Sequence, residues 1–113
     1  MYCVNDSAVM KAWAKDQGID DNEKRASIRY VDGRAKSNVT FLADARCELT
    51  KALDVVMDHP GPMHVLGGER CKRFAAFYDD GVLKAIHVSE APDDPAGDDD
   101  PSASLVEGML PVL

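Results

Sequence analysis

The apolar positions of the N-terminal region predict one strand followed by one helix. Residues 1–4 form a short apolar run. Three apolar residues then recur at the spacing of a helix: Val9, Met10 and Trp13. Asp6 or Ser7 precedes them as a candidate N-cap, and Gly18 follows them as a stop signal. We therefore expect the end of a strand to lead into a helix that finishes near Gly18.

A second strand and a second helix follow along the chain. The segment "VTFLAD", Val39 to Asp44, is β-branched and aromatic, which predicts a buried strand whose last residue caps the next helix. Four residues would form the apolar face of that helix: Leu49, Ala52, Leu53 and Val56. The segment "DHPGPM" has two prolines around a glycine, so we expect the helix to end there and the chain to extend or turn.

The clearest local pattern is a β-hairpin near the C-terminus. Two sets of residues alternate along its first strand: Phe74, Ala76 and Tyr78, and Arg73, Ala75 and Phe77. Asp79-Asp80-Gly81 supplies the turn, and Val82 to Val88 forms the returning strand. A final amphipathic helix is predicted from about Ser102, with four apolar residues: Leu105, Val106, Met109 and Leu110.

Two polar segments lie between these elements. Residues 19–38 predict a surface insertion loop, with a hairpin as an option, and residues 90–101 form an acidic loop rich in Pro and Asp. The remaining pattern is that of a single domain over residues 1–113, because a chain of this length can bury one core. A strand-helix-strand unit requires a parallel pair, whereas the hairpin is antiparallel. We expect an α/β fold with a mixed sheet and helices on its faces.

Composition narrows the class of protein. Apolar residues make up 45% of the chain and charged residues 29%, which indicates neither a disordered nor a membrane protein. No apolar run reaches the roughly 18 residues of a membrane span. The formal net charge of −7 argues against nucleic acid as a partner. The N-terminus resembles neither a signal nor a transit peptide, so we expect a cytoplasmic location, with an organelle as an option if a segment precedes Met1.

The three cysteines are candidates for thiol chemistry: Cys3, Cys47 and Cys71. Their odd number and wide spacing do not fit a disulfide framework. Cys71 has Arg73 on the same strand face, and Cys47 is expected in the first turn of a helix, where positive charge or a helix N-terminus favours the thiolate. The alternative for each is a small apolar residue, partly buried, since free cysteine is commonly found in cores.

Arg73 opens a strand whose other residues on the same face are apolar, so its cation must meet an anion or the surface. A salt bridge at the sheet edge and a site for developing negative charge both remain open. His59 and His64 could bind a metal together with a cysteine, but their spacing fits no zinc pattern, and we expect neither a metal nor a cofactor. The run from Asp93 to Asp100 lacks the ligand pattern of a calcium loop and predicts a solvated loop.

Several ordered blocks together resemble the atypical, type II peroxiredoxins, which are thioredoxin-fold thiol peroxidases. The blocks are "VNDSAVMKAW", "TFLAD" followed by "ELTKAL", "LGGERCKRFAAFYDDGVLKAIHV" and "SASLVEGML". The resemblance covers nearly the whole chain except residues 19–38. It implies an incomplete thioredoxin-like fold in a redoxin that lacks the N-terminal active-site segment of the family.

The resemblance also implies a reaction and a site. A peroxidatic cysteine thiolate attacks hydrogen peroxide or an alkyl hydroperoxide and becomes a sulfenic acid, which glutaredoxin or thioredoxin then reduces. Arg73, in "CKRF", matches the family arginine that stabilises the thiolate and the departing oxygen. Cys71 matches a variable position. The implied biological role is antioxidant defence and redox homeostasis, and a homodimer is one expected state.

Two departures from the family pattern limit the expected activity. The peroxidatic motif P-x-x-x-T-x-x-C does not occur, and Ala103 stands where some members carry a resolving cysteine. We therefore expect the chain alone to be inactive or very weak, with Cys47 as the first thiol to test if activity is found. The alternative function is a non-catalytic thioredoxin-fold module that binds a protein partner.

Overall fold

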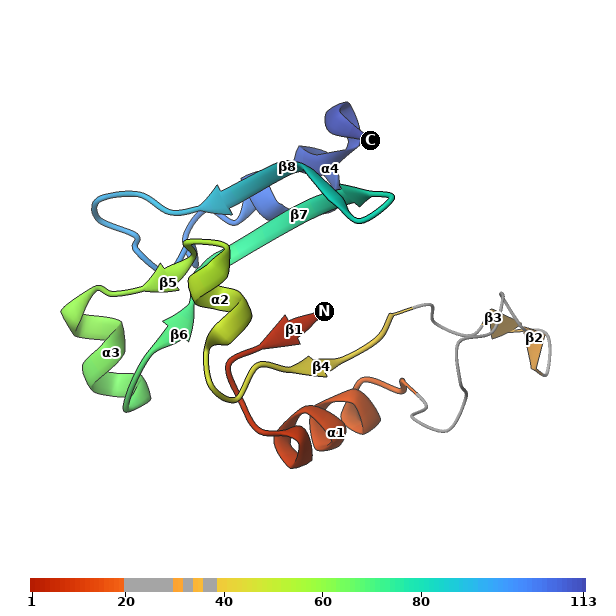
Figure 1. Cartoon of the computed structure of the whole chain (residues 1–113), viewed down its shortest axis with the longest axis horizontal. Coiled ribbons are helices and arrows are strands. Elements are labelled where there is room, and N and C mark those ends of the chain that lie inside the picture. The colour runs from red at the N-terminus through yellow and green to blue at the C-terminus, as the bar shows by residue number, and fades with distance from the viewer. Residues whose placement is uncertain (20–29, 32–33, 36–38) are drawn as a thin grey trace. The chain divides into compact units, whose positions relative to one another are not determined.

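The computed structural model in Figure 1 describes residues 1–19, 30–31, 34–35 and 39–113. The chain forms two compact units, Met1–Glu48 and Leu49–Leu113. The elements of the first unit are β1 (Tyr2–Cys3), α1 (Ser7–Asp16), β2 (Tyr30–Val31), β3 (Arg34–Ala35) and β4 (Leu42–Ala43). Helix α2 (Glu48–Ala52) starts at the last residue of this unit and continues into the second one.

The first unit contains the parallel strand pair that the sequence predicts. Tyr2 of β1 lies opposite Leu42 of β4, and helix α1 between them in sequence packs against β4. Trp13 of α1 meets Phe41 edge to face, with 4.8 Å between the ring centroids. Such an aromatic contact adds stability beyond the area that it buries. The pair of strands and its connecting helix therefore form one local packing unit.

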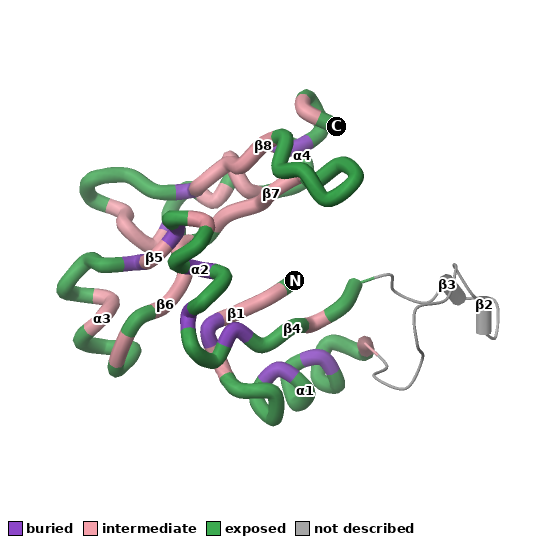
Figure 2. The backbone as a smooth tube through the Cα atoms, viewed as in Figure 1, coloured by how far each residue is buried: buried purple, intermediate pink, exposed green. Residues whose placement is uncertain are grey.

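Helix α1 begins where its capping residue predicts. The side chain of Asp6 accepts a hydrogen bond from the Val9 N–H at 2.9 Å, which satisfies one of the free N–H groups of the first turn. The expected apolar face is only partly correct. Met10 and Ala14 are the buried residues of the helix, whereas Val9 and Trp13 are exposed (Figure 2). The buried face of α1 thus includes Met10, as predicted, and Ala14 in place of Val9 and Trp13.

The prediction of a buried strand at Val39 to Asp44 is wrong in burial and in length. Only β4 is a strand, and Leu42 keeps 56% of its surface exposed. Two strands covered by a single helix leave most of their side chains in water. The expected hairpin within residues 19–38 is present as β2 and β3, which pair antiparallel, while the rest of this predicted insertion loop lies outside the described residues.

The second unit contains the remaining elements: β5 (Val56–Met57), α3 (Pro60–Leu66), β6 (Arg70–Cys71), β7 (Arg73–Asp79), β8 (Val82–Ser89), η1 (Ser102–Ser104), α4 (Val106–Met109) and η2 (Leu110–Val112). Strands β5 and β6 pair antiparallel, and so do β7 and β8. The described strands thus make four two-stranded sheets, one parallel and three antiparallel. Both kinds of pairing expected from the sequence are present, but the expectation that they share one mixed sheet is wrong for the described strands, because the parallel and antiparallel pairs belong to separate sheets.

Two predictions for the middle of the chain are corrected by the structure. Helix α2 ends at Ala52 rather than continuing to Val56, because Asp54 takes a positive φ of 56° and Val56 enters strand β5. The segment "DHPGPM" begins a helix rather than only ending one. Pro60 occupies the first turn of α3, where proline is tolerated because no intrahelical N–H bond is lost.

The predicted hairpin is confirmed with its turn. Asp79 of β7 lies opposite Val82 of β8, and the two residues between them have positive φ values, 49° at Asp80 and 77° at Gly81. Such a turn twists in the sense that the strands require. The predicted final helix is broken into shorter pieces: η1, α4 and η2 replace one continuous helix, and η1 packs against both hairpin strands.

Candidate functional site

Arg73 lies at the first position of β7, at the end of the hairpin farthest from the turn. Its register partner on β8 is Ser89, the last residue of that strand. The preceding strand β6 ends at Cys71, so the chain changes its pairing partner between Cys71 and Arg73. Arginine is suited to such a position because its stem can pack on the sheet while its head stays in water. The side chain is 46% exposed.

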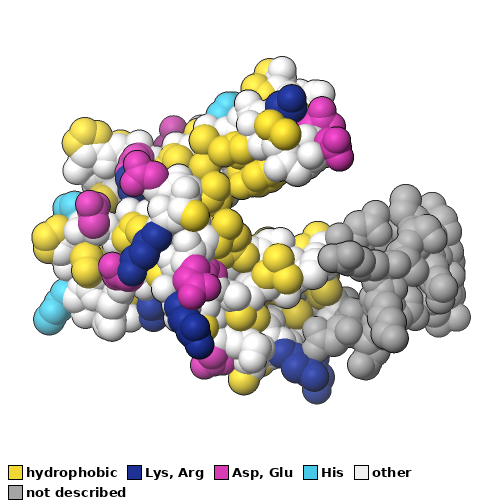
Figure 3. Space-filling model, viewed as in Figure 1, with side chains coloured by type: hydrophobic (Ala, Val, Ile, Leu, Met, Phe, Trp, Pro, Cys, Tyr) yellow, Lys and Arg dark blue, Asp and Glu magenta, His cyan; other side chains and the backbone are white. Residues whose placement is uncertain are grey.

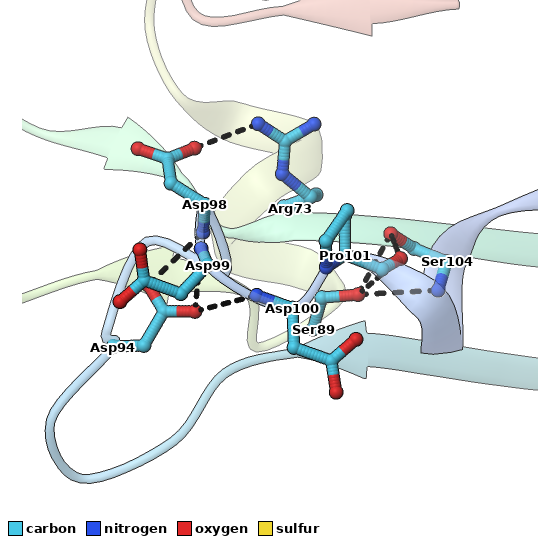
Figure 4. Close-up of polar contacts among 8 residues, drawn as sticks. All are labelled: Arg73, Ser89, Asp94, Asp98, Asp99, Asp100, Pro101 and Ser104. Atoms are coloured by element: carbon cyan, nitrogen blue, oxygen red, sulfur yellow. Dashed lines mark hydrogen bonds and ion pairs between the residues drawn. The ribbon is translucent and has the colours of Figure 1, made fainter.

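Among the residues that the structure describes, the guanidinium of Arg73 makes one ion pair with another side chain. Its Nη2 lies 2.8 Å from Oδ1 of Asp98, an ion pair that Figure 4 shows. Arginine has five N–H donors, and this contact uses one of them. Within the described part of the chain, Nε and Nη1 have no hydrogen-bond partner. Arg73 is therefore held by one ion pair at Nη2, and its other N–H donors are available to an anion from solution.

The partner Asp98 belongs to the acidic loop, residues 90–101, which is organised around Asp94. One carboxylate oxygen of Asp94 accepts the N–H of Asp98 at 3.0 Å, and the other accepts the N–H groups of Asp99 at 3.0 Å and Asp100 at 3.2 Å. Figure 4 shows these bonds converging on one side chain. The expected solvated loop is therefore exposed in much of its surface, yet its backbone is held in a defined turn.

The hydrogen bonds to Asp94 change its acidity. Burial acts to raise the pKa of this carboxyl, but the backbone N–H groups of Asp100, Asp98, Asp99 and Gly97 outweigh it and lower the pKa below the ordinary aspartate value. These donors favour the ionised form because they point at its negative charge. The pKa of Asp100 is also lowered, through hydrogen bonds from the side chain and backbone of Ser102.

Ser89 anchors the same loop to the hairpin. Ser89 is buried, with 2% of its surface exposed. Its Oγ lies 3.0 Å from the Pro101 carbonyl oxygen and 2.8 Å from Ser104 Oγ. It also accepts the N–H of Ser104 at 3.1 Å. Gly97 packs so closely on the Ser89 backbone that a Cβ there would lie 2.0 Å from the Ser89 oxygen. Ser89 is also the register partner of Arg73, and Gly97 precedes Asp98. Ser89 therefore helps to position both residues of the ion pair, Arg73 and Asp98.

Lys72, the residue before Arg73, also forms an ion pair. Lys72 Nζ lies 2.9 Å from Oε2 of Glu90, at the start of the acidic loop. The two adjacent cations of "CKRF" thus meet two acids of one loop. Neither Glu90 nor Asp98 was expected from the sequence as a partner. The alternation of Pro, Gly and Asp after the hairpin was a signal for a turn there, but it did not indicate which carboxylate would reach Arg73.

The structure places the three candidate thiols in different local settings. Cys47 is buried to 3% exposure and precedes α2 with a positive φ of 60°, rather than lying in its first turn as expected. The expected cap is confirmed, since Asp44 Oδ1 accepts the Glu48 N–H at 2.9 Å. Cys3 and Cys71 are half-buried in strands β1 and β6, and the three cysteines, all of which lie in the described ranges, form no disulfide.

The two candidate metal ligands have local roles in α3. His59 is its N-cap, with Nδ1 accepting the Gly61 N–H at 3.3 Å, and His64 lies exposed in its last turn. Over the ranges that the structure describes, no three His, Cys, Asp or Glu side chains gather as metal ligands would. In the same ranges no helix has the length and apolar character to cross a membrane. Ala103, at the resolving-cysteine position, lies in η1.

The family is decided by the extent of one match: residues 1–104 match the Redoxin family. The chain is a redoxin. This match takes in strand β7 with Arg73 as well as the acidic loop. The thiol peroxidase family expected from the sequence blocks is thereby confirmed.

The relatives of this redoxin include a chloroplastic peroxiredoxin and a peroxisomal membrane associated protein. Peroxiredoxin-2E-2, chloroplastic, of Oryza sativa subsp. japonica is 36% identical over 88 residues, which are 77% of this chain and 32% of the rice protein. Peroxisomal membrane associated protein 20 of Schizosaccharomyces pombe is 37% identical over 94 residues, which are 82% of this chain and 49% of the yeast protein. The redoxin chain thus spans about a third of the rice protein and about half of the yeast protein.

A solved structure supports the fold. Reduced Prx3 of Vibrio vulnificus, determined in complex with hydrogen peroxide, superposes with a TM-score of 0.65 at 31% identity. The match covers 99% of this redoxin chain and 55% of the Vibrio chain. The predicted thioredoxin-like α/β class is therefore confirmed.

Proposed function

We propose that Arg73 supplies the guanidinium of a redoxin peroxidase site. In the reaction, a cysteine thiolate attacks one peroxide oxygen, the O–O bond breaks, and the sulfur becomes a sulfenic acid while water or an alcohol leaves with a proton. Negative charge thus moves from sulfur to the departing oxygen. A guanidinium stabilises both ends of this movement, because it keeps its charge over the working pH range and offers several donors in one plane.

One observation carries this proposal: Arg73 is half-exposed, and its Nε and Nη1 groups lack partners among the residues that the structure describes. Arg70 provides the contrast three residues earlier. Its two terminal nitrogens donate to the carbonyl oxygens of Glu69 at 2.9 Å and Leu66 at 3.0 Å. Arg70 is thus committed to local structure, whereas Arg73 has donors available for a substrate.

A chimera tests the role of Arg73. The part of Vibrio Prx3 that superposes on this chain would be replaced by residues 1–113, and peroxide reduction would be measured with a thiol reductant. We expect Arg73→Gln to lower kcat/KM by about 10²–10³, the usual cost of removing one donor that stabilises developing charge. Arg70→Gln is the matched control and should leave the rate nearly unchanged. Equal effects of the two substitutions would refute the assignment.

We also propose that the chain by itself turns over peroxide poorly or not at all. The peroxidatic motif P-x-x-x-T-x-x-C does not occur in its sequence, and Cys47 is almost fully buried, so peroxide has little access to it. Thiol-dependent peroxide consumption by the purified chain tests this directly. A rate comparable to that of an intact peroxiredoxin would overturn the proposal, and Cys47→Ser would then show whether that thiol is responsible.

The reductant, compartment and assembly belong to the same proposal. Glutaredoxin or thioredoxin is the proposed electron donor, with hydrogen peroxide or alkyl hydroperoxides as substrates and a homodimer as a state to test. A peroxidase assay that compares the two donors, run on the chimera, separates them. The cytoplasm is the proposed location, although the names of the relatives mention the chloroplast and the peroxisomal membrane. Cell fractionation with an antibody to the chain decides between these compartments.

A non-catalytic interaction module is the second candidate. Figure 3 shows hydrophobic side chains on the surface of the hairpin, and Tyr78, Val82 and Leu83 near its turn are exposed. Tyr78 and Leu83 are register partners, so their side chains lie together on one face of the hairpin and form an apolar area that a protein partner could cover, whereas Val82 belongs to the other face. Co-purification of a stoichiometric partner that is lost in Leu83→Lys, together with no effect of Arg73→Gln in the chimera, would favour this function.

A further inference from the structure

We propose that Asp98 is an internal counter-anion of Arg73, which competes with any other anion that binds the guanidinium and so weakens its binding. The proposal rests on the proposed function, since it assumes that Arg73 binds an anion. It adds a residue that tunes this binding. The basis is the 2.8 Å contact between Arg73 Nη2 and Asp98 Oδ1.

The contact is built into the fold rather than formed by two independent side chains. The Asp98 N–H is held by Asp94 Oδ1 at 3.0 Å, and the neighbouring Gly97 lies directly on the backbone of Ser89. Ser89 in turn is the register partner of Arg73. The backbones of Asp98 and Arg73 are therefore both held close to Ser89. This lowers the conformational entropy that is lost when their side chains pair.

The contact is also weak enough to be displaced. It is a single hydrogen-bonded contact rather than the two parallel bonds of a bidentate pair, and the two side chains are 46% and 70% exposed. Ion pairs in this setting contribute little because water screens them. An anion that approaches the open Nε and Nη1 donors can thus compete with Asp98.

The other charged groups of the region do not replace Asp98 in this role. Asp94 uses its carboxylate oxygens on backbone N–H groups of the loop, and Lys72 is paired with Glu90. Asp99 is exposed, and no side-chain contact of its carboxylate occurs among the described residues. Asp99 therefore carries the same charge one residue away from Asp98 without touching Arg73, which makes it a matched control.

The test is an NMR titration of the purified chain with inorganic phosphate at constant ionic strength, read at the Nε–H signal of Arg73. We expect Asp98→Asn to tighten phosphate binding about two- to fivefold, the range that removal of an exposed ion pair allows. Asp99→Asn removes the same charge and should have a much smaller effect. Asp98→Ala serves as a second variant, because an asparagine oxygen can still accept from Arg73. The amide signals of residues 98–100 verify that the loop stays folded.

The outcomes separate this proposal from the proposed function. If phosphate shifts the Arg73 signal equally in the natural chain and in both Asp98 variants, Arg73 binds anions but the counter-anion proposal is wrong. It is also wrong if Asp98→Asn weakens binding, or if Asp98→Asn and Asp99→Asn tighten it equally. If phosphate leaves the Arg73 signal unchanged in every variant, the anion-binding role itself fails, and the counter-anion proposal fails with it.

Discussion

The close packing of Gly97 on Ser89 makes a single methyl group a strong perturbation. Gly97 is buried, has a φ of +66° and would place a Cβ 2.0 Å from the Ser89 carbonyl oxygen and 2.8 Å from the Ser89 carbonyl carbon. Gly97→Ala therefore meets backbone, which cannot rotate away as a side chain can. The acidic loop must move by more than an ångström to relieve the overlap, and this shift would carry Asp98 away from Arg73.

The expected loss of stability has two parts. An alanine with a left-handed backbone costs about 1–2 kcal/mol. Overpacking against a fixed neighbour typically adds about 1–3 kcal/mol. Gly97→Ala should thus lower the free energy of unfolding by about 2–5 kcal/mol, a large share of the roughly 5–15 kcal/mol of a natural domain.

Gly81→Ala is the control that separates these parts. Gly81 has a φ of +77°, but a Cβ at this position meets no atom within 4 Å, so only the backbone cost of about 1–2 kcal/mol applies. Urea unfolding followed by far-UV circular dichroism gives both free energies. Hydrogen exchange of the β8 amides reports on the anchored end of the hairpin. If the two variants lose the same stability, the close packing of the loop on Ser89 is not present in solution.

Three further predictions concern single polar groups. Ser89→Ala should lower the free energy of unfolding by about 1–3 kcal/mol, because it leaves the half-buried Ser104 N–H without its acceptor; an unchanged urea midpoint would contradict this. The ionised Asp94 stabilises the folded loop above the unfolded pKa of about 3.9, and because its folded pKa is lower, this stabilisation should be lost as the pH falls from that value through the folded pKa. Urea unfolding at a series of pH values should follow this loss, and Asp94→Asn should remove the part of the pH dependence that Asp94 causes. Asp6→Ala should destabilise α1 by about 0.5–2 kcal/mol, seen as faster amide exchange in its first turn, and equal exchange rates would count against the cap.

The sequence predicted those elements whose signals are local. The turn at Asp80-Gly81 requires positive φ values, and the cap at Asp6 requires an acceptor within three residues, so both could be inferred from neighbouring residue types. Helix lengths were predicted less well. Val56 continues the apolar period of α2, yet it pairs with Cys71 of β6, and a period within one helix carries no information about a strand partner 15 residues later.

The family and the candidate arginine followed from the sequence alone, since they depend on the order of residue types along the chain and Arg73 stands in a recognisable strand block. The tertiary structure decided what surrounds this arginine. Asp98 reaches Arg73 because the acidic loop packs closely on Ser89 at Gly97, and because hydrogen bonds to Asp94 hold the backbone of the loop in its turn. Residues 93–100 contain five aspartates, interrupted only by Pro, Ala and Gly, so residue type does not distinguish one carboxylate from the next. Only the folded backbone determines which of them meets the cation.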